Sequence, residues 1–394
     1  MKVLEGVTVI DFTQTYSGPF CTMQLADFGA KVIKIERKGI GDTSRYWEPL
    51  RNNHSGYFAA INRNKYSVEI DLSSKEGIKI VDELIENADI VVENFKTGTM
   101  EKLGIGYDDI FKYKPDIIYA SLSGYGQTGP LKNYPAYDNI IQSVSGLMDM
   151  TGFPEKSPTK AGPSISDSLA SLNMALGILL AYYHKLNTGE GQRVDVSMLD
   201  SLFGILESPI LFKSLLGVDV TRCGNNDAAT LVPYDVYQCK DGYFSAGLAG
   251  DSGWDKFAGA MNMPELIADP RFSSNTHRCM NFNELDQILK DFFNNRTKQE
   301  LQDAFTNAGI PNAPVLTVAE IMEHQQLKDR DMIMKINDPG IGEYTAIGNP
   351  MKMDQNPAAY EKAAPLLGEN TDEILMDLGY TDLQIKNLRI AGVI

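Results

Sequence analysis

The chain has 394 residues, of which 43% are hydrophobic and 22% are charged, and these proportions are ordinary for a globular protein. Its formal net charge of -16 opposes binding to nucleic acid or to an anionic membrane surface, so we expect neither as a partner. The four cysteines and four histidines show no metal-ligand spacing, so we expect no disulfide framework and no metal site, and a reducing cytoplasm is the natural setting.

Length and hydropathy predict a protein of two domains without a membrane span. A chain of this size exceeds what one hydrophobic core usually supports. The first residues, MKVLEGVTVIDF, become charged and strand-like too early for a signal peptide. The longest apolar run, MALGILLAYY, is shorter than the roughly 18 residues that a membrane span needs, and it fits a buried helix better.

Strands and helices alternate through the first half of the chain. The run VTVIDF (7–12) predicts a strand, and a helix follows from Pro19, because proline favours the first helical position. KVIKIE (31–36) predicts the next strand and completes a β-α-β unit. Helical patterns near 75–87, 97–113 and 168–186 then alternate with the strand-like runs ADIVVENF, DIIYASLS and RVDVSM. This alternation predicts a parallel α/β sheet.

The pattern changes after about residue 220. YDVYQC and GYFSAG are adjacent strand-like runs joined by Lys240 and Asp241, which predicts a hairpin. Helical patterns near 252–262, 282–293 and 298–308 follow. We therefore predict a large domain over 1–215, a smaller α+β domain over 225–325, and a segment over 326–394 that returns to the large domain.

One glycine motif suggests a dinucleotide site but lacks the required context. Residues 124–129 read GYGQTG, which matches GxGxxG and follows a predicted strand. The fingerprint requires a helix directly afterwards, because the helix N-terminus holds the pyrophosphate. Here PLKNYP follows, which is typical of a loop. A nicotinamide or flavin site is therefore not expected.

A basic cluster lies at the end of the second predicted strand. Lys31, Lys34, Arg37 and Lys38 surround a single acid, Glu36, in an otherwise acidic chain. Ligands of open α/β sheets bind outside the carboxyl ends of strands, so Arg37 and Lys38 are placed where phosphates would be met. A solvated basic edge explains the same pattern equally simply.

Asp167 precedes the long apolar helix and has two compatible interpretations. Aspartate and serine are preferred N-caps, so a capping role accounts for the residue without any chemistry. A helix N-terminus also stabilises an ionised carboxylate, which a nucleophile needs.

Taken together, the order and spacing of these segments resemble the class III CoA-transferases of the CaiB/BaiF type, which include formyl-CoA transferase. The matching pieces, which run along nearly the whole chain, are LEGVTVIDFTQTYSGP, LADFGAKVIKIER, NRNKYSVEIDL, VVENF followed by GTMEKLG, IYASLSGYGQTGP, GPSISD, TGEGQRVDVSMLD, GNND, PYDVYQCKDGY and APLLGENTDEIL. Their combination is far more specific than any one of them.

The resemblance implies an activity and a set of site residues. Asp167 falls on the family's catalytic aspartate, which forms a mixed anhydride and then an aspartyl-CoA thioester, from which an acceptor acid takes the CoA. Lys102 stands where many members have arginine, and lysine keeps the charge but loses the bidentate fork. The residues expected to bind CoA are Tyr16, Arg37, Lys38, Asn94, Phe95, Lys102 and Tyr137, and those expected in a substrate loop are Gly224, Asn225 and Asn226. The implied partners are an acyl-CoA and a small carboxylic acid, with no permanently bound cofactor and no metal.

The resemblance also implies a fold and an assembly. We expect a Rossmann-like large domain with a parallel sheet, built from both ends of the chain, plus the smaller α+β domain. Two subunits are expected to interlock as a homodimer, a topology that the general rule against threading would never predict.

Two alternatives share this scaffold. An α-methylacyl-CoA racemase needs two acid/base groups, and the family's histidine should fall in the segment 134–138, where Tyr137 stands instead; the nearest upstream histidine is His54. A non-catalytic CoA-binding protein is the other alternative, and the retained Asp167 argues against it. The missing second acid/base group favours the transferase.

The sequence says less about the substrate. Formyl-CoA/oxalate enzymes of this family carry glutamine where Tyr16 stands, and they have a longer glycine-rich loop than GNNDAAT. Both differences argue against an oxalate enzyme. Tyr16 and Phe20 suit a bulkier acyl group, although an aromatic side chain at the rim or in the core is the commoner explanation.

Overall fold

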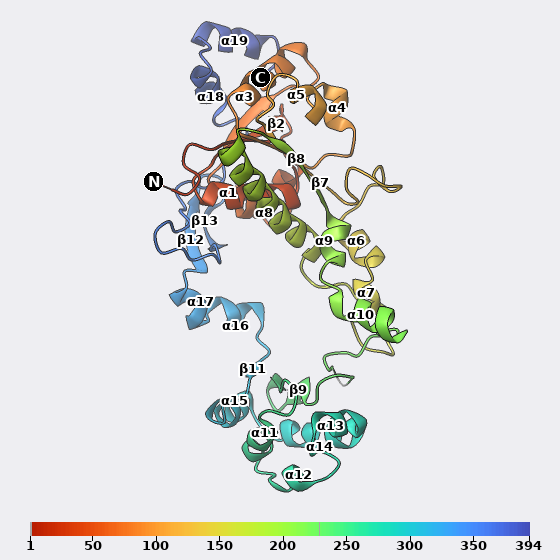
Figure 1. Ribbon diagram of the computed structural model, residues 1–394. Coiled ribbons are helices and arrows are strands. Elements are labelled where there is room, and N and C mark those ends of the chain that lie inside the picture. Colours follow the sequence, from red (N-terminus) through yellow and green to blue (C-terminus); the bar gives the residue numbers. More distant parts are fainter. Residues whose placement is uncertain (1, 228) are drawn as a thin grey trace. The chain divides into compact units, whose positions relative to one another are not determined.

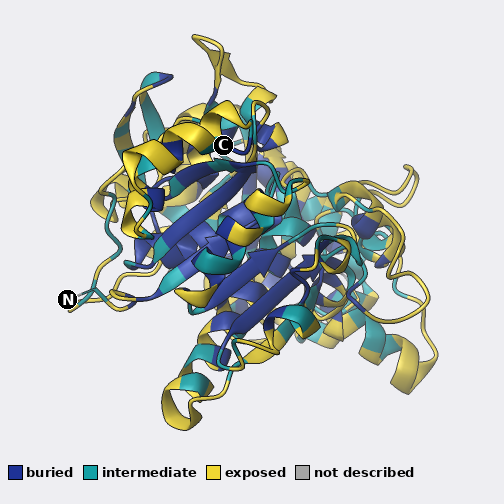
Figure 2. Cartoon of the chain, turned by 90° about the horizontal axis from the view of Figure 1, so that it is seen from above, coloured by how far each residue is buried: buried dark blue, intermediate teal, exposed yellow. Residues whose placement is uncertain are grey.

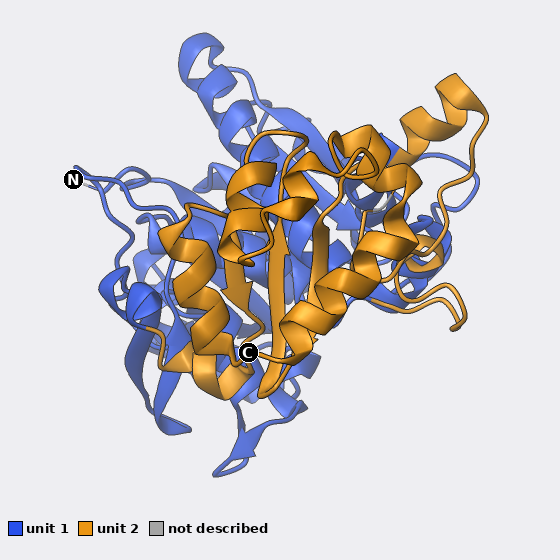
Figure 3. Cartoon of the chain, turned by 90° about the horizontal axis from the view of Figure 1, so that it is seen from below, with its two compact units in different colours: residues 1–147, 161–208, 325–394 blue, residues 148–160, 209–324 orange. Residues whose placement is uncertain are grey.

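The computed structural model describes residues 2–227 and 229–394, and it divides the chain into two compact units. Unit 1 comprises 1–147, 161–208 and 325–394, and unit 2 comprises 148–160 and 209–324 (Figure 3). The large unit is thus built from both ends of the chain. Residues 148–160, which precede the long helix, belong to the small unit.

Unit 1 contains a six-stranded, fully parallel sheet, as the alternating pattern predicted. In spatial order its strands are β5 (Tyr66–Ile70), β2 (Lys31–Arg37), β1 (Thr8–Asp11), β6 (Ile90–Glu93), β7 (Ile118–Ser123) and β8 (Gln192–Ser197). The central strands are almost entirely buried, as the dark strands in Figure 2 show. Such burial on both faces explains why they read as continuous apolar runs. The edge strand β5 was not predicted.

Helices cover both faces of the sheet (Figure 1). On one face, α1 (Ser17–Asp27) and α8 (Ile165–Thr188) pack together over the sheet. The other face is covered by α3 (Lys75–Glu86) with α18 (Thr371–Asp377) and α19 (Asp382–Ile390). The remaining helices of unit 1 are short: α2 (Gly56–Ile61), α4 (Thr99–Leu103), α5 (Tyr107–Ile110), α6 (Asp138–Val144), α9 (Met198–Phe203), α17 (Gln325–Asp329) and the 3-10 turn η1 (Thr43–Tyr46). The boundary between the two units falls within α7 (Leu147–Met150) and within α10 (Glu207–Leu216).

Two predicted helix boundaries were wrong. The helix expected over 97–113 is two short helices, because Gly104 adopts a left-handed conformation (φ 78°) that ends α4. The long helix begins at Ile165 rather than at 168. Elsewhere in unit 1, the hairpins β3 (Leu50–Arg51) with β4 (His54–Ser55) and β12 (Ile333–Asp338) with β13 (Gly342–Ile347) are antiparallel.

The expectation that no segment is long and apolar enough to cross a membrane was also wrong. Among the described residues one helix, α8, passes that test by length and composition, with a mean hydropathy of 1.3. A core helix of a globular protein passes the same test, and α8 buries one face, including Met174 and Ile178, against the sheet and α1. The apolar residues of that face are therefore used in packing, whereas Leu176 and Leu180 on another face are exposed.

Unit 2 is an α+β unit with an aromatic core. The predicted hairpin is confirmed, since β9 (Tyr234–Cys239) pairs antiparallel with β10 (Gly242–Gly247), which also pairs with β11 (Asn312–Pro314). Phe293 and Phe305 stack at its centre with ring centroids 5.6 Å apart. Its helices are α11 (Trp254–Ala260), α12 (Glu265–Ala268), α13 (Asn275–Met280), α14 (Phe282–Asn294), α15 (Lys298–Asn307) and α16 (Val318–Met322).

Candidate active site

The strand order of unit 1 creates a topological switch point between β1 and β6. From β1 the chain moves outward through β2 and β5, and it then returns to β6 and moves the other way. Ligands of open α/β sheets bind outside the carboxyl ends of the strands at such a point. The loops that follow the two strands are joined here, because Asn94 accepts the Gln14 N–H at 2.8 Å and donates to the Gln14 carbonyl at 2.8 Å.

Buried ion pairs fix the base of this region. Asp11 ends β1 and pairs with Lys65 at 3.1 Å, and both side chains are fully buried. Burial alone would raise the pKa of Asp11, but the charges of Lys65 and Lys34 outweigh it and lower the pKa to about 2. Lys34 is also buried and lies 3.0 Å from Asp42.

The basic cluster predicted at the end of β2 is therefore not a single exposed patch. Lys34 points into the protein, and Lys31 pairs with Asp377 at 2.8 Å. Arg37 is exposed and Lys38 is partly exposed at the carboxyl end of β2. Arg37 and Lys38 are therefore the two members of the cluster that are accessible to a bound phosphate at this strand end.

The loop after β1 holds Tyr16 in a constrained position. Thr15 has a φ of 66°, which a β-branched residue rarely adopts, and its N–H is held by the Asp42 carboxylate at 3.1 Å. Gly18 is required just beyond, because a Cβ there would lie 2.3 Å from the Thr13 Cβ. The TQTYSGP segment is thus shaped by sterics at two positions, and it places Tyr16 directly before α1.

Asp167 lies in the first turn of α8 and is not its N-cap. The N-cap is Ser164, whose side chain makes no capping hydrogen bond, and Asp167 is the third helical residue. The carboxylate is half-buried. Burial raises its pKa to about 7, the nearby charge of Asp138 acts in the same direction, and a hydrogen bond with Ser17 opposes both. Capping therefore does not account for this carboxylate.

An aromatic wall stands beside Asp167. The hydroxyl oxygens of Tyr16 and Ser168 are 3.2 Å apart, and the Tyr16 ring stacks on Phe20 with centroids 5.5 Å apart. Tyr57 contacts both Tyr16 and Trp47, with centroids 6.1 and 5.3 Å apart. Burial and then the charge of Asp167 raise the pKa of Tyr57 to about 12.

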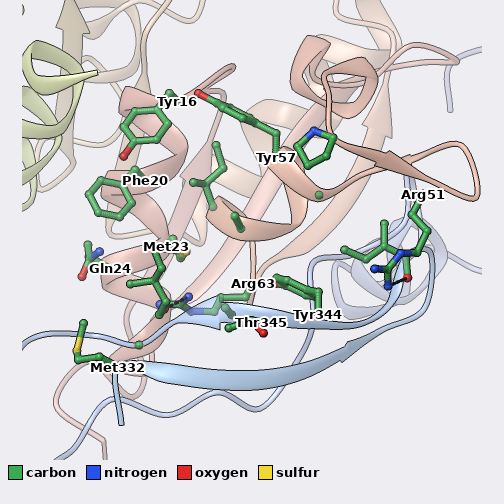
Figure 4. Close-up of a pocket in the computed structure, with 18 of the residues that line it drawn as sticks. Tyr16, Phe20, Met23, Gln24, Arg51, Tyr57, Arg63, Met332, Tyr344 and Thr345 are labelled. Atoms are coloured by element: carbon green, nitrogen blue, oxygen red, sulfur yellow. Dashed lines mark hydrogen bonds between the residues drawn. The ribbon is translucent and has the colours of Figure 1, made fainter. Parts of the chain in front are cut away.

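Tyr16, Phe20 and Tyr57 also line a cavity of about 760 Å³ within unit 1 (Figure 4). Its far wall is the β12–β13 hairpin, and most of its lining is apolar. Two cations reach it. Arg63 is neutralised by a bidentate pair with Asp27 (2.9 and 2.7 Å), whereas Arg51 donates only to the main-chain carbonyls of Ile341 and Glu343. Among the described lining residues, Arg51 is the cation without a carboxylate partner.

The other predicted site residues belong to both units. Asn94 joins the two loops, and Phe95 packs against the core. Lys102 is exposed on α4, which follows β6, and Tyr137 is exposed just before α6. Gly224, Asn225 and Asn226 belong to unit 2, where Asn226 Nδ2 donates to the Cys223 carbonyl at 2.8 Å.

Sequence reasoning missed Tyr57, Arg51 and Asp138. Arg51 lies in the two-residue strand β3 and Tyr57 in the six-residue helix α2, which are too short to show a periodic pattern, so nothing local marked them. Asp138 directly follows Tyr137, in the segment 134–138 where the functional residues expected were Tyr137 itself and, in a racemase, a histidine. His54, the nearest upstream histidine, lines a different cavity with Arg45 and Asp338.

The fold and the site define an α/β protein of Rossmann-like topology, with a ligand-binding edge at the switch point and a perturbed carboxylate beside an aromatic cavity. The chain belongs to CoA-transferase family III, whose model matches residues 4–371. It is therefore an enzyme of the CoA-transferase class.

Characterised relatives match along nearly the full chain. It is 34% identical to a mouse succinyl-CoA:glutarate CoA-transferase, covering all of this chain and 91% of the relative. It is 37% identical to a succinyl-CoA:mesaconate CoA-transferase of Haloarcula hispanica (96% and 97% covered) and 37% identical to an acetyl-CoA:oxalate CoA-transferase of Acetobacter aceti (93% of each). A crystal structure of a CaiB/BaiF family protein from Brucella suis superposes with a TM-score of 0.85 at 31% identity, over 96% of this chain and 99% of that one.

Proposed function

We propose that this enzyme transfers coenzyme A between carboxylic acids through covalent intermediates on Asp167. The observation that carries the proposal is the position of that carboxylate. It is half-buried in the first turn of α8, beside Tyr16 and Tyr57, and its pKa is raised to about 7 by burial and by Asp138. A partly desolvated carboxylate is a stronger nucleophile than one in water, and the α8 N-terminus supports its charged form.

The steps balance without any proton transfer. An Asp167 oxygen attacks the thioester carbon, the carbon–sulfur bond breaks, and a mixed anhydride and CoA thiolate form. The thiolate then attacks the Asp167 carbonyl, which releases the donor acid as a carboxylate and leaves an aspartyl-CoA thioester. The acceptor carboxylate attacks that thioester and gives a second anhydride, from which the thiolate takes the acceptor acyl group and restores Asp167. Water must be excluded throughout, because an anhydride hydrolyses readily.

CoA is proposed to lie along the carboxyl ends of β1, β2 and β6. Arg37 and Lys38 are placed to meet its phosphates from the end of β2, and Lys102 from α4. Asn94 holds the two loops at the switch point together, which fixes the edge along which the pantetheine arm would run. The thioester then reaches the Asp167 carboxylate beside the aromatic wall.

The acids are proposed to be dicarboxylic acids longer than oxalate. Two of the relatives are named for succinyl-CoA with glutarate and for succinyl-CoA with mesaconate, which carry a second carboxylate, whereas a third is named for acetyl-CoA with oxalate. In this chain the cavity beside Tyr16 and Tyr57 holds about 760 Å³, more than oxalate requires. Arg51 at its wall has guanidinium N–H groups left for a distant carboxylate, because only its Nη1 is engaged.

The enzyme is proposed to act as a homodimer. The side of α8 that faces away from the sheet carries an exposed apolar stripe, with Leu176, Leu180 and Tyr183 exposed by 57, 63 and 70%. Stripes of this kind mark protein interfaces, and the family resemblance implies a second copy as the occupant. Light scattering should give the wild-type enzyme the mass of two chains, and after refolding from denaturant Leu180→Glu should regain fewer dimers than Leu383→Glu, on the exposed side of α19. A wild-type enzyme with the mass of one chain would contradict the proposal.

The test of the nucleophile is a covalent adduct. Wild-type enzyme incubated with succinyl-CoA should gain the mass of CoA less water on the peptide that contains Asp167, and hydroxylamine should remove it. Asp167→Asn and Asp167→Ala should show no adduct and no turnover, with unchanged circular dichroism. Transfer by Asp167→Ala at a near wild-type rate would remove Asp167 from the mechanism.

A further inference from the structure

The N-terminus of α8 is capped by a side chain from another helix. Its own N-cap, Ser164, provides no side-chain hydrogen bond, so the first backbone N–H groups of the helix need other acceptors. Asp138 Oδ1 accepts the Ser166 N–H at 2.9 Å and also the Ser166 hydroxyl at 2.8 Å. Ser166 is fully buried and immediately precedes Asp167.

Asp138 is itself held by a second contact. It is the first residue of α6, and its other oxygen, Oδ2, accepts from Gln142 Nε2 at 2.6 Å, one turn along the same helix. Gln142 is fully buried, and its Oε1 accepts the Ala161 N–H at 2.8 Å. The start of α6 therefore holds the segment from 161 to 166 at both of its ends, and that segment leads directly to Asp167.

The charged and titratable groups around the Asp167 carboxylate come from four elements. Asp138 faces it from α6, Ser17 from α1 and Tyr57 from α2, and the Tyr16 hydroxyl lies on the adjoining Ser168. Of these, Asp138 is the residue that carries a negative charge toward Asp167 and also makes hydrogen bonds to the backbone of its helix.

We propose that Asp138 is a positioning residue for CoA transfer, which fixes the start of α8 so that the Asp167 carboxylate faces the acyl group and which opposes that carboxylate's resting charge. The inference rests on the proposed role of Asp167. Asp138 touches no reacting atom and acts through Ser166 and Asp167.

The hydrogen-bond pattern allows a matched set of variants. In Asp138→Asn the side-chain oxygen of residue 138 can still accept from Ser166. Its new NH2 group then faces the NH2 group of Gln142, so the hydrogen bond between residues 138 and 142 is lost. In the double variant Asp138→Asn with Gln142→Glu, the carboxylate introduced at position 142 accepts both from the new amide and from the Ala161 N–H, so the contacts return with the charge moved one turn away. Asp138→Ala removes both contacts. Asp382→Asn, at the exposed first residue of α19, is the control.

The experiment measures kcat, KM for succinyl-CoA and the pH profile of kcat/KM for each variant, per folded active site. Asp138→Ala should lower kcat about tenfold or more with KM nearly unchanged, since a small misplacement of a reacting group has effects of this size. Asp138→Asn should lower kcat and move the acidic limb of the profile to lower pH, and the double variant should recover most of the kcat of the wild type. Asp382→Asn should match the wild type.

A wild-type kcat and pH profile for Asp138→Ala, even with lower stability, would overturn the inference, because a merely structural role moves stability alone. Failure of the double variant to regain kcat above Asp138→Asn would also overturn it. Neither result touches the proposed function, which fails separately if Asp167→Ala still forms the adduct and turns over.

Discussion

Replacing Asp167 with asparagine should stabilise unit 1 above pH 7 while it removes the proposed nucleophile. Burial, with the charge of Asp138, raises the pKa of this carboxyl from 3.8 to about 7 in the folded protein. In the unfolded chain the pKa returns to about 3.9. Because the folded pKa is the higher one, the contribution of this group to stability is intact below about pH 4 and is lost as the pH rises through about 7.

The size of the effect follows from these two pKa values. A rise from 3.8 to about 7 corresponds to about 4 kcal/mol of lost stability at pH 8, at about 1.4 kcal/mol per pKa unit. Because the carboxylate keeps some contact with solvent, which screens charge, we expect about half of this, about 2 kcal/mol. Asparagine has nearly the same shape and carries no charge at any of these pH values. It should therefore gain about 2 kcal/mol at pH 8, less at pH 5, and almost nothing at pH 3.

Urea unfolding at pH 5 and pH 8 measures this gain, and the two tryptophans make it specific to one unit. Trp47 lies in unit 1 and Trp254 in unit 2, so a Trp254→Phe background leaves fluorescence that reports unit 1 alone. Asp167→Asn should raise the unfolding midpoint with an unchanged slope, and more at pH 8 than at pH 5. Asp382→Asn is the control. A variant no more stable than its background at pH 8, or equally stabilised at both pH values, would refute the reasoning.

Three further predictions concern ligands. Arg37→Ala should raise KM for a CoA thioester about tenfold and leave KM for the corresponding pantetheine thioester unchanged, because only CoA carries the phosphates; equal effects on both would exclude a phosphate contact. Arg51→Gln should raise KM for glutarate about tenfold, because a charge-assisted hydrogen bond to its second carboxylate is lost, and it should leave KM for a monocarboxylic acid of similar length unchanged. Equal increases in KM for both acids would exclude Arg51 as the partner of the second carboxylate. A 2-methylacyl-CoA incubated in D2O should keep its α-proton by mass spectrometry, because the pKa of Tyr57 is raised to about 12 and both oxygens of Asp138 are engaged by Ser166 and Gln142. Exchange would favour the racemase.

The parallel sheet and the α+β hairpin were predictable because burial imposes local patterns. Strands buried on both faces, such as β6 and β7, read as unbroken apolar runs, and the Lys240–Asp241 turn is short enough to join two adjacent runs as a hairpin. The strand β5 was missed because two of its five residues are only partly buried and polar residues interrupt its apolar pattern. Its place at the edge of the sheet, where packing is weakest, explains the weak signal.

The site was predictable only where the resemblance named a residue. Asp167 was located in this way, but its surroundings were not, because they depend on long-range contacts. The Ser166–Asp138 contact spans 28 residues and the Asn94–Gln14 contact spans 80. No local periodicity encodes such pairs. For the same reason the burial of Lys34 against Asp42 was not predicted from a cluster that looked uniformly basic.

The same desolvation that makes Asp167 costly to the fold favours its chemistry. In the resting enzyme the carboxylate is ionised at pH 8 against burial and the charge of Asp138. In the proposed mechanism acylation converts it to a neutral anhydride, so both unfavourable terms disappear in the first step, and the negative charge moves to the departing CoA thiolate. The free energy released in this step has the same origin as the stability that Asp167→Asn gains, because both remove a buried negative charge at position 167. A nucleophile that the fold held comfortably ionised would lack this gain, and removing the Asp138 charge without replacing it nearby, as in Asp138→Asn alone, should accordingly slow acylation.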